Sequence, residues 1–308
     1  MTRLLVVGSY NASLTVFSSE LPRRGQTVLG DDLDIGPGGK GNNQAIAARR
    51  LGFEVTFVVK VGRDAFGNAA REFFQREGLP SSSVLDGRRG TGVALIMVDR
   101  SGDNLISVAP ETNAELELAD VVRLSPTVDN ATHLLCQLEC TVELFRGVAL
   151  WARQRQMRVI LNPAPAVELG DETYGLVDIL TPNQTELQVL AGREVRSGDE
   201  VVEAARTLLK RGVGEVIVTL GDRGAIHVTP DAVCAYDAYP VDATDTTGAG
   251  DSFNGALAGA LSAGAPMADA IDLAMRAAAF CVTRRGVIDG LPSRTELDIE
   301  VPSRVLAL

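Results

Sequence analysis

One glycine-rich segment combines residue types that can hold a phosphate and accept a proton. It runs from Asp245 to Asp251 as Asp-Thr-Thr-Gly-Ala-Gly-Asp and leads into an apolar-periodic stretch typical of a helix. The small residues Gly248, Ala249 and Gly250 leave backbone N–H groups uncovered, and such groups at a helix start attract anions. Asp251 is predicted in the first helical turn, within reach of a group that receives a phosphoryl. The structural alternative is that Asp251 only caps the helix.

A second glycine-rich segment, residues 36–44 (Gly-Pro-Gly-Gly-Lys-Gly-Asn-Asn-Gln), precedes a helix predicted over 45–51. It is not a P-loop, because four residues must separate the first glycine from Gly-Lys and a Ser or Thr must follow Lys40. Its glycines do match the dinucleotide-binding spacing, and Asp64 follows at about the required distance. An NAD-dependent oxidoreductase is therefore an alternative. Lys40 and Asn43 suit a polyhydroxylated ligand better than a pyrophosphate.

Together the two segments resemble the signatures of the PfkB carbohydrate kinase family, and within it the chain is most similar to the ribokinases. The resemblance extends from 8–12 to 282–286, and four further segments match the family in order: 91–96, 161–166, 181–186 and 219–224. So many ordered matches are far more specific than either glycine-rich segment alone. The resemblance implies an ATP-dependent sugar kinase that phosphorylates a primary hydroxyl of a furanose-like sugar, with ribose 5-phosphate as the expected product.

The resemblance also implies roles for individual residues. Asp251 is the expected base, and the N–H groups of Gly248, Ala249 and Gly250 are the expected anion hole. The residues expected to bind the sugar are Asn11, Ser13, Gly38, Gly39, Lys40, Asn43, Glu139 and Asp251. Those expected to bind ATP are Asn183, Glu186, Thr219, Gly221, Gly224 and Gly250.

Two cations are implied as well. Mg²⁺ is expected with ATP, and K⁺ is expected as an activator beside the anion hole. Hard oxygen ligands suit both ions. The residues expected to hold the monovalent cation, mostly through backbone carbonyls, are Asp245, Thr247, Cys281, Arg284 and Gly286.

At one sugar-binding position the chain departs from the ribokinase pattern. Ser13 stands where ribokinases have an aspartate, so a charge-assisted hydrogen bond worth ~1.5–3 kcal/mol is lost. Smaller departures are the turn at 108–113 and Gly290, which replaces a serine common near the cation. A nucleoside kinase or another sugar kinase of the same family is therefore an alternative. A non-catalytic sugar sensor is a more distant one.

Composition excludes some partners. The formal net charge is −11 over 308 residues with no basic block, so we expect no nucleic-acid partner. No signal peptide pattern or membrane-length apolar run is present, so we expect a cytoplasmic protein without a membrane partner. The histidines His133 and His227 lie in apolar strand-like runs and are expected to be structural. Reduced core thiols are expected for Cys136, Cys140, Cys234 and Cys281.

Strands and helices alternate along most of the chain, which predicts an α/β fold with a doubly wound, mostly parallel sheet, as one domain over residues 1–308. The apolar run 4–7 is typical of a strand covered on both faces. Segments 13–17, 26–35, 92–98 and 104–108 instead alternate apolar and polar residues, which predicts a small sheet with one wet face. We expect this sheet, approximately 13–35 and 92–108, to form a lid and to pair in a homodimer.

Overall fold

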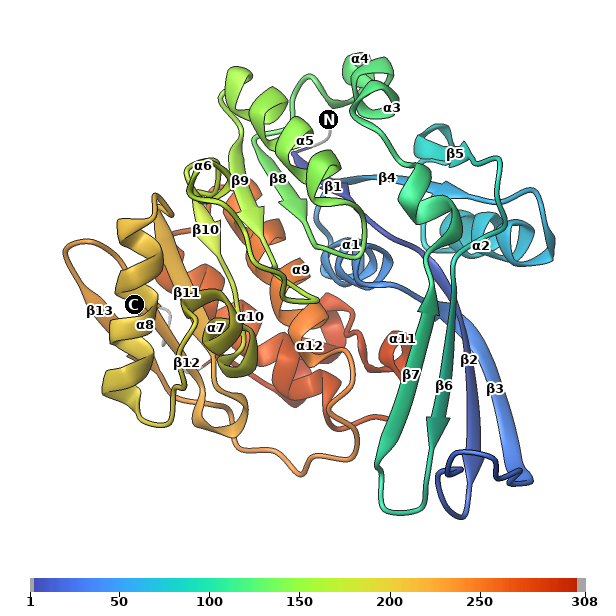
Figure 1. Ribbon diagram of the computed structural model, residues 1–308. Helices are drawn as coiled ribbons and strands as arrows, with labels where there is room; N and C mark the ends of the chain where they lie inside the picture. The colour runs from blue at the N-terminus through green and yellow to red at the C-terminus, as the bar shows by residue number, and fades with distance from the viewer. Residues whose placement is uncertain (1–2, 304–308) are drawn as a thin grey trace.

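The structure is a computed structural model that describes residues 3–303, and a large twisted sheet lies at its centre (Figure 1). Its nine strands follow the order β13-β12-β11-β10-β9-β8-β1-β4-β5. Neighbouring strands are parallel, except for the antiparallel pairs β11–β12 and β12–β13. The strands are β1 (Leu4–Val7), β4 (Val55–Val61), β5 (Val84–Asp86), β8 (His133–Cys136), β9 (Arg158–Leu161), β10 (Ile179–Leu180), β11 (Glu215–Thr219), β12 (Ala225–Val228) and β13 (Val233–Tyr236). The predicted doubly wound α/β fold is confirmed, with an edge hairpin, β12–β13, that the sequence analysis did not foresee.

Strand β1 shows why the central strands are apolar throughout. Its alternate side chains enter two different cores, Leu4 and Val6 on one face and Leu5 and Val7 on the other, and none is more than 2% exposed. The first core is covered by α1 (Lys40–Arg50), α2 (Ala65–Arg76), α9 (Ala249–Ser262) and α10 (Met267–Cys281). The second is covered chiefly by α5 (Val142–Gln154), α7 (Gln184–Ala191) and α8 (Gly198–Lys210).

Shorter helices complete the chain between and after these elements (Figure 1). They are α3 (Leu118–Arg123), α4 (Ser125–Val128), α6 (Asp171–Tyr174), α11 (Val287–Gly290), α12 (Arg294–Glu300) and the 3₁₀ turns η1 (Ser81–Ser83), η2 (Glu111–Glu115) and η3 (Gly221–Arg223). None of the helices within residues 3–303 combines the length and apolar character that crossing a membrane requires.

The carboxyl ends of the parallel strands bring polar residues to one edge of the sheet. Cys136 at the end of β8 pairs with Leu161 at the end of β9, and Leu161 pairs with Leu180 at the end of β10. The polar residues that follow, Asn162 and Thr181 among them, therefore lie side by side. This edge is where doubly wound folds bind their ligands.

A separate sheet of four strands projects away from the large sheet (Figure 1). Its order is β3-β2-β6-β7, with β2 (Asn11–Ser18) parallel to β6 (Val93–Val98) and antiparallel to β3 (Gly30–Gly38), and with β6 antiparallel to β7 (Asn104–Ala109). The predicted small sheet is thus present, although its second strand begins at Gly30 and not at residue 26.

One face of this sheet is apolar and open to solvent. Strand register places Leu14 beside Ile35 and Leu95, and Val16 beside Leu33 and Met97. Directly paired residues share a face of a sheet. We call this surface the apolar lid face; it consists of Leu14, Val16, Leu33, Ile35, Leu95, Met97 and Leu105. All of these except the half-buried Leu14 are exposed.

The structure corrects one expectation about the cysteines. All four are free, but Cys234 is exposed because it lies on the edge strand β13, and Cys140 is only partly buried. Only Cys136 and Cys281 are core thiols. An edge strand and a covered strand have similar local sequences, so the sequence alone does not distinguish them.

Both histidines are buried and outside the pocket described below. The Nε2 atom of His227 lies 2.8 Å from the carboxylate of Glu215, and Nδ1 of His133 lies 2.9 Å from the Thr132 hydroxyl. Burial lowers the pKa of His133 to about 4. These positions agree with the structural role that was expected.

Candidate active site

The first glycine-rich segment does form a helix start with free N–H groups. Helix α9 begins after Gly248, which has a φ of 83°. Within residues 3–303 the backbone N–H groups of Gly248 and Gly250 have no partner, whereas that of Ala249 donates to the Thr246 carbonyl at 3.3 Å. The anion site therefore has two free donors where three were expected. A Cβ at position 248 would lie 2.6 Å from Val287 Cγ1, so only glycine fits there.

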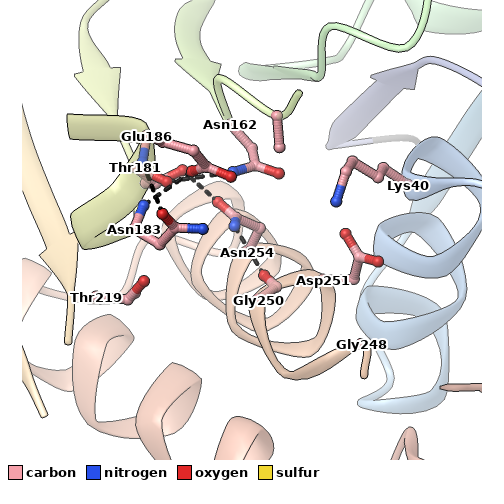
Figure 2. Close-up of a pocket in the computed structure, with 11 residues that line it drawn as sticks. Lys40, Asn162, Thr181, Asn183, Glu186, Thr219, Gly248, Gly250, Asp251 and Asn254 are labelled. Carbon is pink, nitrogen blue, oxygen red and sulfur yellow. Dashed lines mark hydrogen bonds between the residues drawn. The ribbon is translucent and has the colours of Figure 1, made fainter. Parts of the chain in front are cut away.

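A cavity of about 160 Å³ opens at this helix start (Figure 2). Its walls come from the start of α1, the loops after β9, β10 and β11, and the first turns of α7 and α9. It is lined by Lys40, Asn162, Ala164, Thr181, Asn183, Glu186, Thr219, Gly248, Gly250, Asp251 and Asn254. The two glycine-rich segments, far apart in the sequence, therefore meet at one site.

Asp251 lies in the first turn of α9, as predicted, and is only 7% exposed. Its Oδ1 accepts a hydrogen bond from Gln44 Nε2 at 2.9 Å, and its Oδ2 accepts one from Asn43 Nδ2 at 2.8 Å. Both donors come from helix α1. The carboxylate is thus held between two helices and does not cap its own.

Helix α1 begins at Lys40, earlier than the predicted start at residue 45. The glycine within the helix serves a close approach of two backbones: a Cβ at Gly41 would lie 2.5 Å from Ser9 N. Gly41 is therefore required for packing and does not interrupt the helix. As a result, Lys40, Asn43 and Gln44 all lie in the first turns of α1, beside Asp251.

The Lys40 ammonium group is the cation of this pocket, and Figure 2 shows it directed toward Asp251. The Asp251 carboxylate raises the pKa of Lys40, with smaller contributions from Glu139 and Glu186, against the opposing effect of burial. Lys40 therefore stays charged at neutral pH. A fixed positive charge at this point stabilises negative charge that develops in the pocket.

Glu139 lies at the N-terminus of helix α1, next to the backbone of Lys40. Its carboxylate accepts the backbone N–H of Lys40 at 2.8 Å and the hydroxyl of Ser9. A carboxylate at a helix N-terminus is electrostatically favourable. This contact brings Glu139 next to the glycine-rich segment, where the sequence analysis expected it.

The other predicted sugar-binding residues lie at the end of the small sheet that adjoins helix α1. Asn11 and Ser13 on β2 pair with Gly38 and Gly36 on β3, directly before helix α1. Asn113 donates to Asn11 Oδ1 at 2.8 Å, so the unusual turn at 108–113 still contacts this position. The side-chain oxygen of Asn11 is therefore already engaged, and Asn11 itself is buried and does not line the cavity.

Of the predicted ATP-binding residues, Asn183, Glu186, Thr219 and Gly250 line the cavity, whereas Gly221 and Gly224 do not. Asn183 and Glu186 make a reciprocal capping box at the start of α7, each side chain accepting the other's backbone N–H at 2.8 Å. Burial raises the pKa of Glu186. Asn183 pairs with Thr219, and the turn that contains Gly221 and Gly224 follows directly.

The expected cation residues also lie together, beside the anion site. The Asp245 carboxylate accepts the N–H groups of Thr247 at 2.9 Å and Gly286 at 3.1 Å. Although burial opposes it, these hydrogen bonds lower the pKa of Asp245. The Cys281 thiol donates to the Thr247 carbonyl at 3.7 Å, and the Arg284 N–H donates to the Cys281 carbonyl at 3.3 Å. The segment thus brings a carboxylate and backbone carbonyl groups close together, and these are the oxygen donors that hard cations take.

No cluster of three or more His, Cys, Asp or Glu side chains suited to a metal ion occurs in the part of the chain that the structure describes. On the side of the cavity formed by the start of α7, the oxygen atoms that could bind a metal belong to the Glu186 carboxylate and the Asn183 amide. They fit Mg²⁺ only in combination with oxygens of a bound nucleotide.

Four polar residues at or next to the cavity were not predicted from the sequence: Gln44, Asn162, Thr181 and Asn254. Asn254 donates to the Gly250 carbonyl at 2.8 Å and accepts from the Thr181 hydroxyl at 2.5 Å (Figure 2). Gln44 Nε2 donates a hydrogen bond to Asn162 Oδ1 at 2.9 Å. Each of these residues belongs to, or directly follows, a segment that was singled out, so a polar residue at a strand end or in a helix start was the available signal.

Asp64 does not take the role that the dinucleotide alternative gave it. It is the N-cap of α2 and accepts from the backbone N–H of Gly67 and from the N–H and hydroxyl of Thr91, all at 2.7 Å. Its oxygens are therefore engaged in holding the loop before β6.

A helix-start anion site with a buried carboxylate, at the carboxyl edge of a doubly wound sheet, defines an α/β small-molecule kinase. Residues 1–294 match the family described as pfkB family carbohydrate kinase, and the chain belongs to this family. It is a phosphotransferase that acts on sugar hydroxyls, and this membership rules against the oxidoreductase alternative.

Individual relatives of known activity are consistent with this family membership. The ribokinase of Haemophilus influenzae is 35% identical over 294 residues, which are 95% of this chain and 96% of that protein. The deoxyribokinase of Salmonella typhi is 33% identical over 292 residues, 94% of this chain and 95% of that protein. A structure of Arabidopsis thaliana ribokinase complexed with ribose and ATP has a TM-score of 0.88 and 29% identity, and covers 96% of this chain and 98% of that one.

Proposed function

We propose that this chain is an ATP-dependent kinase that converts ribose to ribose 5-phosphate. The observation that carries the proposal is the placement of Asp251 beside the free N–H groups of Gly248 and Gly250 and the Lys40 ammonium. The ribokinase relatives, one of them in complex with ribose and ATP, support ribose and ATP as the substrates.

In this proposal each residue has a defined task. Asp251 accepts the proton of the primary hydroxyl as the hydroxyl oxygen attacks the γ-phosphorus. The N–H groups of Gly248 and Gly250 and the ammonium of Lys40 stabilise the charge on the transferred group. Asn11, Ser13, Gly38, Gly39, Asn43 and Glu139 bind the sugar, and Asn183, Glu186, Thr219, Gly221 and Gly224 bind the nucleotide.

Both expected cations are part of the proposal. Glu186 and Asn183 would hold Mg²⁺ together with the nucleotide phosphates, and Asp245, Thr247 and neighbouring carbonyls would hold K⁺. When bound, such ions neutralise phosphate charge. This matters in a chain with a net charge of −11 and one lysine in the pocket. A cytoplasmic location and the absence of nucleic-acid and membrane partners stay predictions from the sequence.

A screen of ADP release tests the function. With ATP, Mg²⁺ and K⁺, pentoses, deoxypentoses, hexoses and nucleosides are compared as acceptors, and ribose is expected to give the highest kcat/KM. A clear preference for a nucleoside would favour the alternative activity within the family. No ADP release with any acceptor would contradict a kinase and favour a sensor.

We propose that the chain works as one domain over residues 1–308 and that the small sheet is its lid. Closure of a lid excludes water from the transferred phosphoryl group. Amides in 13–35 and 92–108 are expected to exchange hydrogen more slowly when ribose and ATP are both bound, while those of β1 stay unchanged. Hydrogen exchange with mass spectrometry measures this. Equal exchange in the free and liganded states would indicate a preformed site without a lid.

We also propose a homodimer that pairs the apolar lid faces of two chains. An apolar patch of seven side chains on a projecting sheet is costly to leave in water. Light scattering is expected to give the mass of a dimer for the wild type and of a monomer for Leu95→Asp, because the aspartate is placed in the middle of the face. Leu150→Asp, at an equally exposed leucine on α5, serves as the control and should stay dimeric. A monomeric wild type would overturn the proposal.

A further inference from the structure

A row of three buried amide side chains lies next to Asp251, and its central member has no place among the substrate contacts. It consists of Gln137, Gln44 and Asn162, which are 3%, 0% and 6% exposed. Gln44 is the central member and does not line the pocket. A fully buried glutamine beside a carboxylate is costly unless its polar atoms are paired. Its partners therefore show what it does.

Every side-chain hydrogen of the Gln44 amide is used. Its N–H₂ group donates to Asp251 Oδ1 and to Asn162 Oδ1, both at 2.9 Å. Its Oε1 accepts from Gln137 Nε2 at 2.6 Å. A rotated amide would set its oxygen against two acceptors and its N–H₂ against a donor. The neighbours therefore fix the amide in one orientation, with a donor aimed at Asp251.

The two oxygens of Asp251 are held in different ways. Oδ1 is bound by Gln44, which solvent and ligands do not reach. Oδ2 is bound by Asn43, whose own oxygen accepts from Asn42 at 3.1 Å. Asn43 is one of the proposed sugar-binding residues, so its contact with Oδ2 can be exchanged for one with the sugar. The contact between Gln44 and Oδ1 involves no proposed substrate ligand, because Gln44 does not line the cavity.

We infer that Gln44 is a positioning residue that holds Asp251 Oδ1 and thereby presents Oδ2 to the sugar hydroxyl. This inference rests on the proposed function. The hydroxyl proton passes to Oδ2, the hydroxyl oxygen forms a bond to the γ-phosphorus, and the bond from that phosphorus to the bridging oxygen breaks as ADP leaves. Gln44 exchanges no proton and touches neither substrate. It keeps the carboxylate from turning away from the acceptor.

Two substitutions at this position separate positioning from packing. Gln44→Leu removes the donor. Gln44→Glu keeps the shape, and its carboxyl group donates to Asp251 only when protonated, whereas two ionised carboxylates repel each other. We expect Gln44→Leu to lower kcat by about 10- to 100-fold at every pH, as for loss of a hydrogen bond to a charged group. The kcat of Gln44→Glu should be lowered by the same factor at about pH 8 and should rise toward the wild-type value near pH 6.

The control and the readouts make the result decisive. Gln188→Glu changes an amide on α7 that accepts from the Val195 N–H at 3.1 Å, and should keep the wild-type kcat and pH profile. The KM for ATP is expected to be unchanged in both Gln44 variants, because nucleotide contacts are intact. Thermal unfolding verifies that each variant folds, and if Gln44→Leu does not, the pH profile of Gln44→Glu decides alone.

Failure of this inference differs from failure of the proposed function. An active wild type together with a Gln44→Glu variant that follows the wild-type pH profile, or a folded Gln44→Leu variant with kcat within about twofold, would overturn the positioning role and leave the kinase standing. A wild type without activity on any sugar would overturn both.

Discussion

The Asp251→Asn variant is expected to lose about 10²–10⁴-fold in kcat while its affinity for ATP stays within a few-fold of wild type. Asparagine has the shape of aspartate but cannot take the proton from the sugar hydroxyl. The nucleotide wall around Asn183 and Glu186 is unchanged by the substitution. Steady-state kinetics in a coupled ADP assay measures the first quantity, and isothermal titration calorimetry measures the second.

The structure adds a detail to this prediction. Two N–H donors, from Gln44 and Asn43, point at the two oxygens of Asp251. An asparagine there sets its own N–H₂ group against one of them, so the variant should also unfold at a lower temperature. Asp231→Asn, in the exposed turn before β13, is the matched control and should change neither kcat nor the affinity for ATP nor the unfolding temperature. If Asp251→Asn keeps more than about a tenth of the wild-type kcat, Asp251 is not the general base.

The Ser13→Asp variant is expected to raise kcat/KM for ribose about tenfold, mainly by lowering KM. Hydrogen bonds to hydroxyls that do not react are made in the ground state and the transition state alike, so they change KM more than kcat. A gain of ~1.4 kcal/mol corresponds to that factor. Ser13 is partly buried and lies beside glycines on β3: it pairs with Gly36, and its Cβ is 3.3 Å from the Cβ position of Gly38, so no β3 side chain lies next to it. The kinetics of both proteins are measured on pentoses, deoxypentoses and nucleosides.

The same substitution also distinguishes the alternatives to ribose. If the natural sugar lacks or inverts a hydroxyl at this corner, an aspartate is left unpaired against it and activity on that sugar should fall. The deoxyribokinase among the relatives makes 2-deoxyribose a necessary member of the panel. A wild type that already prefers ribose and is harmed by Ser13→Asp would show that Ser13 does not face the sugar.

The central sheet and its helices were predictable because their signals are local. Strand β1 is apolar at every position because it is covered on both faces, and α5 follows its apolar periodicity from residue 142 to 154. The edge hairpin β12–β13 was not predicted: β12 lies in the apolar strand-like run around His227, but the short, exposed strand β13 shows no alternation that would pair it with β12. The start of α1 was missed for a different reason. Glycine usually ends a helix, whereas Gly41 serves a contact with Ser9, 32 residues earlier in the chain.

The candidate site divides in the same way. Two glycine-rich helix starts, with a carboxylate in one and a lysine in the other, are readable from the residues alone, because each is a local motif with a local consequence. By contrast, the hydrogen bond between Gln44 and Asp251, 207 positions apart, and the identity of the free N–H groups in the anion site are known only from the folded chain. Hydrogen bonds between distant segments depend on how helices α1 and α9 pack against the sheet, and no local pattern encodes that packing.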